Sequence, residues 1–315
     1  MNIAVVHGGH STESAISSKN AHYITAALAE NGHNAFMLAF DENTYLKLHA
    51  ERPDLVFIAV QGKHHGDGTM QSICEILKIP YTGSRAAAAA LINNKFHCKS
   101  ICSYHDIRTP EYLYLSMQAF FGTPRQEIIR EIERKMRLPV VAKAVSQGGS
   151  FGIELIQTWD DYDLIAKTFE FDNEIIIERF IQGKPVTTSI LEIHRRPTAL
   201  TTLTCYNVDQ PNDGLILFNR PFLAKSEEYP QNLLAEIEHT ALKAFQLLGA
   251  KNYARVDFMI EDETGWPYFL EINAVPGLKP ESFFPQAARI SGISLNELIR
   301  MIAENEMSDK ENKCP

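Results

Sequence analysis

The sequence predicts an α/β protein in which an N-terminal domain of parallel βα units precedes two α+β subdomains. Three observations predict this class. Short apolar runs alternate with helical spacing over residues 1–92, a glycine-rich segment near residue 150 lies between two strand-like runs, and an acidic hairpin pattern follows at residues 254–273. A chain of 315 residues is long enough for two or three domains. We expect domains at 1–92, 93–182 and 183–305, and a disordered tail at 306–315.

Composition excludes several classes of protein. The hydrophobic content is 45% and the charged content 22%, which is ordinary for a globular chain. No run approaches the roughly 20 apolar residues that span a bilayer, and the start MNIAVVHGG reads as a buried strand and not as a secretory signal. Five cysteines without zinc-type spacing suggest reduced thiols in the cytoplasm. A net charge of −9 with no basic run argues against nucleic acid as a partner.

The N-terminal elements follow one another in the order expected of a parallel sheet. Residues 3–6 and 55–60 are strand-like, residues 11–30 and 69–77 have helical spacing, and the loop 61–68 follows the second strand. Residues 85–99 are alanine-rich and are expected to form one helix. Loops at the carboxyl ends of parallel strands are the usual ligand-facing loops.

A glycine-rich loop at residues 146–152 lies between strand-like runs at 139–143 and 153–156. Rossmann and Walker phosphate loops need a helix after the glycines, so a hairpin tip is the better prediction here. Its backbone amides can wrap phosphate, and a mobile tip can close as a lid. Lys143 ends the first strand, where a buried ammonium needs a partner such as phosphate. A flexible surface turn is the alternative.

An acidic hairpin gives the most informative pattern. If it pivots about Thr264, Asp257 lies opposite Glu271 and Arg255 lies opposite Asn273. Opposed carboxylates repel unless a cation lies between them, and this all-oxygen set suits Mg²⁺. The alternative is a solvated hairpin face, or a surface salt bridge in the case of Arg255.

In order along nearly the whole chain, these segments resemble the ATP-grasp fold and, within it, the D-alanine–D-alanine ligases. The matching motifs are HGGHSTE at 7–13, GDGTMQ at 66–71, IPYTGS at 79–84, IERFI at 177–181 and LEIN at 270–273, followed by Pro276-Gly277, Ser282 and Pro285. The last group is the most specific.

The resemblance implies roles for individual residues. The ATP-binding residues it implies are Lys95, Lys143, Gly148, Gly149, Ser150, Glu178, Arg179 and Ile181. The metal ligands it implies are Asp257, Glu271 and Asn273. The catalytic residues it implies are Arg255, Glu13, Gly277 through its amide, and Ser150. The substrate residues it implies are Glu13 for the first amino group, Ser282 for the second carboxylate, and Gln61 and Lys279 beside them. A lysine so near a turn is otherwise more often a solvated surface residue.

The chain also departs from the family pattern. The family usually has histidine at Gln61, glutamate at Gly66, serine at Gly149 and a ribose-binding carboxylate at Pro185. Its tyrosine-containing loop is not recognisable in residues 211–225. These departures leave the amino acid substrate open.

The chemistry implied is attack of a carboxylate on the γ-phosphate of ATP, then displacement of phosphate from the acyl phosphate by an amine. The implied cofactors are ATP and two Mg²⁺ ions, for which Mn²⁺ can substitute. The implied setting is cytoplasmic peptidoglycan (cell wall) biosynthesis with amino acid substrates, no nucleic acid or membrane partner, and a homodimer as one candidate assembly.

Two alternatives stay open: a ligase for another amino acid or metabolite, and a non-catalytic nucleotide-binding regulator. Phosphate release that depends on an added amino acid distinguishes the enzyme from the regulator.

Overall fold

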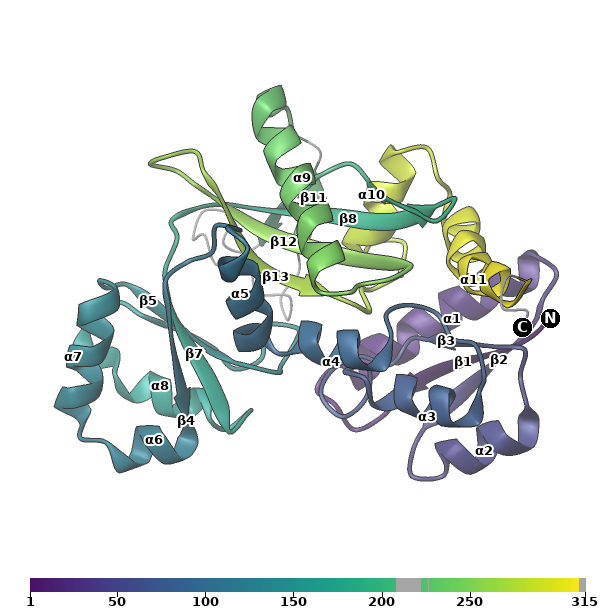
Figure 1. Cartoon of the computed structure of the whole chain (residues 1–315), viewed down its shortest axis with the longest axis horizontal. Coiled ribbons are helices and arrows are strands. Elements are labelled where there is room, and N and C mark those ends of the chain that lie inside the picture. The colour runs from purple at the N-terminus through teal and green to yellow at the C-terminus, as the bar shows by residue number, and fades with distance from the viewer. Residues whose placement is uncertain (208–221, 226, 312–315) are drawn as a thin grey trace.

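The N-terminal domain is built on a parallel sheet, as the alternation of strands and helices predicts. The computed structural model describes residues 1–207, 222–225 and 227–311 of the chain. Strands β1 (Asn2–Gly8), β2 (Asn34–Phe40) and β3 (Leu55–Ile58) pair in parallel in the order β2-β1-β3. Helices α1 (Ser14–Glu30), α2 (Thr44–Glu51) and α3 (Thr69–Leu77) connect and cover it (Figure 1). The loops after β1 and β3 leave the sheet at the same edge.

Two helices link this domain to the rest of the chain, where one was expected. Helix α4 (Ala86–Asn93) and helix α5 (Lys95–Tyr104) are separated by the single residue Asn94. Asn94 has an extended backbone, and its side-chain oxygen accepts the amide of His97, which caps α5. The expectation of a single helix over residues 85–99 is therefore wrong, because an N-cap inside the alanine-rich pattern interrupts it.

The central subdomain is a four-stranded antiparallel sheet. Strands β4 (Tyr112–Ser116), β5 (Val140–Ala144), β6 (Ile153–Ile156) and β7 (Glu174–Arg179) lie in the order β4-β7-β5-β6. Helices α6 (Met117–Gly122), α7 (Arg125–Lys135) and α8 (Asp163–Thr168), with the short 3₁₀ helix η1 (Trp159–Asp161), enclose an apolar core on one side. The antiparallel pairing of β5 with β6 confirms the predicted hairpin around the glycines.

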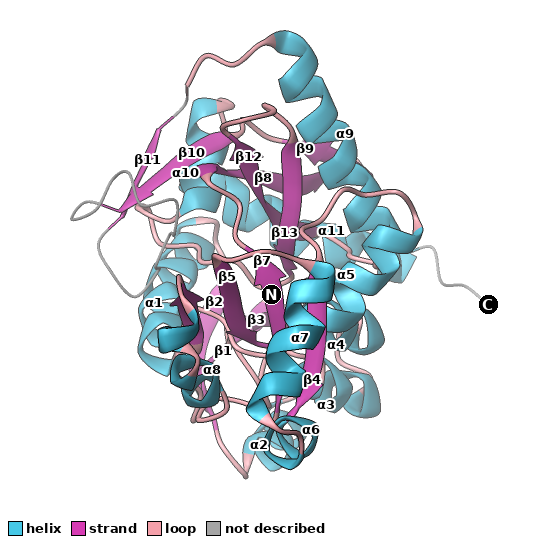
Figure 2. Ribbon diagram, turned by 90° about the vertical axis from the view of Figure 1, so that its left-hand side faces the viewer, coloured by secondary structure: helices cyan, strands magenta, loops and turns pink. Residues whose placement is uncertain are grey.

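The C-terminal sheet is larger. Its strands are β8 (Gly183–Ile193), β9 (Arg196–Ala199), β10 (Leu203–Asn207), β11 (Phe222–Lys225), β12 (Tyr253–Glu261) and β13 (Pro267–Asn273). The order is β11-β10-β8-β12-β13, with β9 paired to β8 (Figure 2). Helix α9 (Gln231–Leu247) and α5 pack on the face that carries Val256 and Phe258. Asp257, which alternates with Val256 and Phe258 along β12, therefore lies on the opposite face of the sheet.

The chain ends against the domain with which it begins. Helix α10 (Phe283–Ile290) is followed by α11 (Leu295–Glu311), which packs beside α1 (Figure 1). The expected tail is thus helical as far as Glu311, and Glu306 is buried and paired with Lys251 at 3.1 Å. Among the described residues, no helix is long and apolar enough to cross a membrane.

Candidate active site

Two adjoining cavities lie where the three parts of the molecule meet. The larger, about 930 Å³ including its mouth, lies between β5–β7 of the central subdomain and β8, β12 and β13 of the C-terminal sheet. The smaller, about 600 Å³, extends to the loops after β1 and β3. Lys95, Gln147, Gly148 and Glu271 line both. The two spaces therefore meet at a wall that carries charged side chains and a glycine of the loop at residues 146–152.

The hairpin of β12 and β13 has the predicted pairing. Asp257 is opposite Glu271 and Arg255 is opposite Asn273. The register shifts immediately after Asp257, where Phe258 pairs with Phe269. A β-bulge therefore follows the acidic pair and leaves its alignment intact.

Asp257 is held from two sides. Arg255 donates to both of its oxygens, at 2.9 and 2.7 Å, and the Thr187 hydroxyl donates to Oδ1 at 2.5 Å. The Arg255 and Asp257 side chains are 10% and 11% exposed. The alternative of a surface salt bridge is therefore wrong, because this bidentate pair lies in the protein interior. Removing one partner would leave the other charge buried without compensation.

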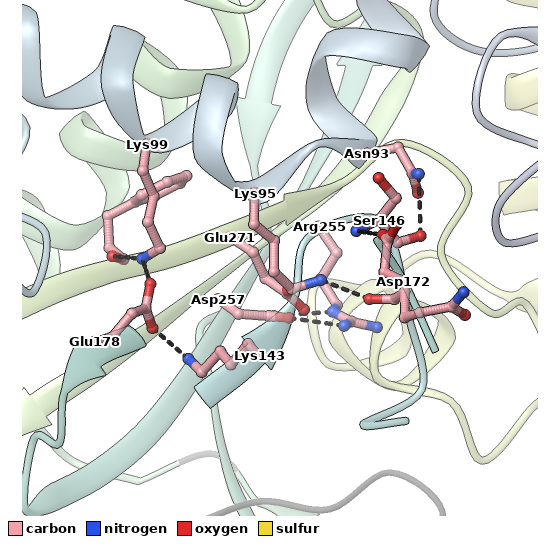
Figure 3. A network of polar contacts seen from close by, with 12 residues as sticks. Asn93, Lys95, Lys99, Lys143, Ser146, Asp172, Glu178, Arg255, Asp257 and Glu271 are labelled. Atoms are coloured by element: carbon pink, nitrogen blue, oxygen red, sulfur yellow. Dashed lines mark hydrogen bonds and ion pairs between the residues drawn. The ribbon is translucent and has the colours of Figure 1, made fainter. Parts of the chain in front are cut away.

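Glu271 lies between cations on the cavity wall (Figure 3). Lys95 Nζ is 3.3 Å from its carboxylate and also donates to the Gln147 carbonyl at 2.5 Å. The enclosed position opposes ionisation, but Lys95, Lys143 and Arg255 together hold the pKa of Glu271 below its ordinary value. Glu271 is therefore anionic at neutral pH.

Glu178 joins two lysines at the other end of the same row of charges (Figure 3). Lys143 lies 2.5 Å from Oε2 and Lys99 lies 2.8 Å from Oε1. Burial alone would raise the pKa of Glu178, but the two ammonium groups outweigh it and lower the pKa to about 2. Lys143 thus reaches the cavity beside a permanently charged carboxylate.

The glycine-rich tip presents unused donors to the larger cavity. Gly148 and Gly149 line it, and their amides donate to no group in the described part of the chain. Ser150 also lines it, with a left-handed backbone at φ 63°. A Cβ atom at position 148 would lie 2.6 Å from Glu13 Oε2, so the glycine lets the tip lie directly against the Glu13 carboxylate.

The remaining residues on the nucleotide side of the site all line the larger cavity, but one of them, Arg179, is bound to other side chains. Glu178, Ile181 and Pro185 line the larger cavity. Arg179 also lines it, but its guanidinium is bound by Glu111 at 2.7 Å and Glu261 at 2.8 Å. Its side chain is thus committed to protein contacts.

Of the expected substrate residues, two line the smaller cavity and two do not. Glu13 and Gln61 line it, and burial raises the pKa of Glu13 although Lys95 opposes the rise. Ser282 and Lys279 line neither cavity. Lys279 is paired with Glu281 at 3.1 Å, which favours the surface alternative for this lysine. The Ser282 hydroxyl does not cap α10 and lies beside Gly277.

Arg255 and Gly277 also line neither cavity. The Arg255 guanidinium lies 5.5 Å from the ring centre of Phe283, next to Ser282 in the chain. Ser282 and Gly277 therefore lie side by side, and the residue after Ser282 lies against Arg255. The family's tyrosine loop, expected around residues 210–225, lies mostly outside the described residues, which leave out 208–221.

Sequence reasoning missed Lys99, Thr187 and Asn20. Lys99 lies one helical turn after Lys95, a spacing that could have revealed it. Thr187 comes from a strand 70 residues from Asp257, and Asn20 contacts a turn some 260 residues away. Neither of those contacts has a local signal.

The donor set of the hairpin fits a hard divalent cation. It offers the carboxylates of Asp257 and Glu271 and the amide oxygen of Asn273, which accepts one hydrogen bond from Val275 and keeps a second lone pair. Within the described residues no cluster of three or more His, Cys, Asp or Glu offers a rival metal site.

Comparisons with known proteins agree with this arrangement. Residues 101–304 match the family model described as the D-ala D-ala ligase C-terminus. The chain is 34% identical to a D-alanine–D-alanine ligase of Carboxydothermus hydrogenoformans over 96% of this chain and 97% of that one, and 30% identical to that of Aquifex aeolicus over 96% and 99%.

Solved structures give the same result. A D-alanine–D-alanine ligase from Bacillus anthracis, complexed with ATP, superposes with a TM-score of 0.82 at 26% identity and full coverage of both chains. A D-Ala:D-Ser ligase from Enterococcus faecalis has a TM-score of 0.81 at 22% identity over 97% of this chain and 99% of that one, which shows the shared fold.

Proposed function

Because the chain belongs to the D-alanine–D-alanine ligase family of ATP-grasp enzymes, we propose that it joins two molecules of D-alanine at the expense of ATP. The observation that carries the proposal is the wall shared by the two cavities. A phosphoryl group bound by Lys95 in the larger cavity would face a small amino acid in the smaller one. The proposed setting is cytoplasmic synthesis of a peptidoglycan precursor.

The first half of the reaction transfers the γ-phosphoryl group to the carboxylate of the first D-alanine. Glu13 binds the ammonium group of that D-alanine, and Lys95 and Lys143 bind the phosphates together with the free amides of Gly148 and Gly149. Asp257, Glu271 and Asn273 would hold Mg²⁺, which would neutralise charge at the phosphates. The hairpin tip excludes water, to which an acyl phosphate would be lost.

In the second half, the amine of the second D-alanine attacks the acyl carbon and phosphate leaves. Ser282 binds the carboxylate of this D-alanine, and Arg255 with the amide of Gly277 stabilises the oxyanion. Arg255 reaches this position already oriented by its two hydrogen bonds to Asp257. Its charge is thus directed and does not need to reorganise during the reaction.

A ligase for another amino acid is the second candidate. Gln61 stands where the family usually has histidine and lines the smaller cavity, so the wall nearest the amino acids has a different donor pattern. A changed hydrogen-bonding wall alters substrate choice more strongly than a changed volume does.

The test is identification of the product by mass after incubation with ATP, Mg²⁺ and a panel of D- and L-amino acids. We expect D-alanyl-D-alanine as the dominant product, with phosphate release that requires D-alanine. A mixed peptide as the main product would establish the second candidate. ATP binding with no peptide from any pair would exclude both.

Two variants at matched residue types test the metal assignment. Glu271→Gln should abolish peptide formation without loss of the fold, because the site loses one of two carboxylates. Glu281→Gln removes a carboxylate that pairs with Lys279 outside both cavities, and should leave the rate near that of the unaltered protein. Turnover by Glu271→Gln at ordinary Mg²⁺ would refute the assignment.

A further inference from the structure

Two buried amide side chains of the N-terminal domain hold a turn of the C-terminal subdomain. Asn20 on α1 is 2% exposed and Gln61 after β3 is 6% exposed. The Asn20 oxygen accepts the backbone amides of Leu278 and Lys279, both at 3.1 Å. Gln61 Nε2 donates to the Val275 carbonyl at 2.6 Å, and Asn20 Nδ2 donates to Gln61 Oε1 at 3.4 Å.

The backbone at both ends fixes the direction of every bond in this network. Two N–H groups require an oxygen of Asn20, which turns its amino group toward Gln61. A carbonyl at Val275 requires the amino group of Gln61, which turns the Gln61 oxygen toward Asn20. Replacing either amide by its acid therefore sets two acceptors against each other, whichever way the remaining amide is flipped.

The turn held in this way carries Gly277. A Cβ atom at position 277 would lie 2.9 Å from Ser282 Oγ and 3.8 Å from Asn20 Oδ1, so the turn, the serine and Asn20 are closely packed. Asn20 lines neither cavity and cannot itself touch a substrate there. Its influence must act through the turn.

We propose that Asn20 is a positioning residue for the second half of the reaction. Through Gln61 and the turn at residues 275–279, it sets where the Gly277 amide and the Ser282 hydroxyl meet the second amino acid. This inference rests on the proposed function. Phosphoryl transfer occurs at Lys95, Lys143 and the acidic pair, none of which is bonded to Asn20, so the first half should be insensitive to it.

The two halves can be measured separately with ATP that carries ¹⁸O in the β–γ bridge. Reversible transfer of the γ-phosphoryl group to the amino acid carboxylate frees the bridge oxygen on ADP. That oxygen then exchanges position with the other β-phosphate oxygens before ATP re-forms. The rate of this isotope exchange in ATP measures the first half of the reaction, and the rate of dipeptide formation measures the second half. In Asn20→Asp, exchange should persist while the ratio of exchange to dipeptide rises on the order of tenfold to a hundredfold, as expected for a misplaced group.

The matched control is Asn31→Asp. Asn31 ends the same helix and also bridges to the C-terminal part of the chain, through the Asn296 carbonyl at 3.1 Å. The control loses bonds of the same kind, so the ratio should stay at the wild-type value even if the melting temperature falls. Asn20→Ala removes the acceptor of both turn amides without adding a charge and should raise the ratio as Asn20→Asp does, which covers failure of the first variant to fold.

Equal losses of exchange and dipeptide in Asn20→Asp and Asn20→Ala, with an unchanged ratio, would overturn the positioning role and leave the proposed function standing. Absence of any amino-acid-dependent exchange in the wild-type protein would overturn the proposed function and this inference with it. The two failures are therefore distinguishable.

Discussion

Glu13 is a carboxylate that the fold keeps from solvent against the tip of the glycine loop. Burial raises its pKa, which Glu271 also favours, while Lys95 and Arg255 oppose the rise. A raised pKa in the folded state means that the folded protein holds this proton more tightly than the unfolded chain does. The stabilising contribution is present at acid pH and is lost as pH rises through the raised pKa of Glu13.

We therefore predict that Glu13→Gln stabilises the ligand-free protein at about pH 8 and has little effect at about pH 4. Its melting temperature, compared with that of the wild-type protein across this range, is the measurement. Amino-acid-dependent ATP cleavage should be lost at the same time, because the ammonium group loses its partner. A lower melting temperature than wild type at neutral pH would contradict the prediction.

Lys99 is a wholly buried lysine, bound to Glu178 and, at 3.0 Å, to Thr109. We predict that Lys99→Met lowers the free energy of unfolding by about 3–5 kcal/mol, because Glu178 is left with one cation. Adding Glu178→Gln should recover much of this loss.

The free energy of unfolding of the single and the double variant is measured by denaturation in urea. Arg300→Met is the control, since its pair with Glu304 is exposed and should contribute less than about 1 kcal/mol. Equal effects of Lys99→Met and Arg300→Met would mean that the buried pair has no special role.

At the scale of residues, the sequence predicted the acidic pair but not the residues from distant segments that hold the site in place. Asp257 and Glu271 are found because strand side chains alternate with period two and the hairpin turn is short. Asn20 and Thr187 are not found, because each acts on residues distant in sequence through a contact that only the folded chain creates.

At the scale of elements, the loop at residues 147–152 is bonded at its two ends, where Gln147 donates to the Phe171 carbonyl and the Gly152 carbonyl accepts the amide of Ala144. Lys95 holds the Gln147 carbonyl and Asn93 holds that of Ser146, whereas Gly148 and Gly149 donate nothing within the described residues. We predict fast hydrogen exchange at these two glycine amides without nucleotide, and strong protection with ATP and Mg²⁺.

Exchange followed by mass spectrometry or NMR tests this. The amide of Ser146, bound by Asp172 at 2.9 Å, is the internal control and should be protected in both states. Equal protection of Gly148 with and without ATP would argue against a lid.

Element boundaries were less predictable than element types. The parallel sheet and both hairpins follow from apolar periodicity and turn residues. The break at Asn94 is a capping effect inside a strong helical pattern. Residues 306–311 are polar except for Met307, but they continue a helix whose apolar side packs against the core that includes α1. Tertiary packing therefore overrides a local composition typical of a tail.

At the scale of the whole molecule, one ion pair ties the N-terminal domain to the central subdomain beside the lid. Lys63, in the loop after β3, lies 2.7 Å from Asp172, between α8 and β7. The Asp172 side chain is almost wholly buried and also accepts the amide of Ser146 at the base of the lid. The pair therefore holds the two walls of the site together.

We predict that Lys63→Met weakens closure without unfolding either part, because Asp172 keeps its hydrogen bonds from Ser146 and Asn173. The ATP concentration for half-maximal rate should rise about fivefold, the equivalent of about 1 kcal/mol for a partly exposed pair, while the rate at saturating ATP changes little. The radius of gyration without nucleotide should increase in small-angle scattering. Lys47→Met is the matched control, since its pair with Asp41 at 2.5 Å lies within the N-terminal domain and spans no boundary. If Lys63→Met and Lys47→Met behave alike in both measurements, closure depends on the lid and the bound nucleotide and not on this pair.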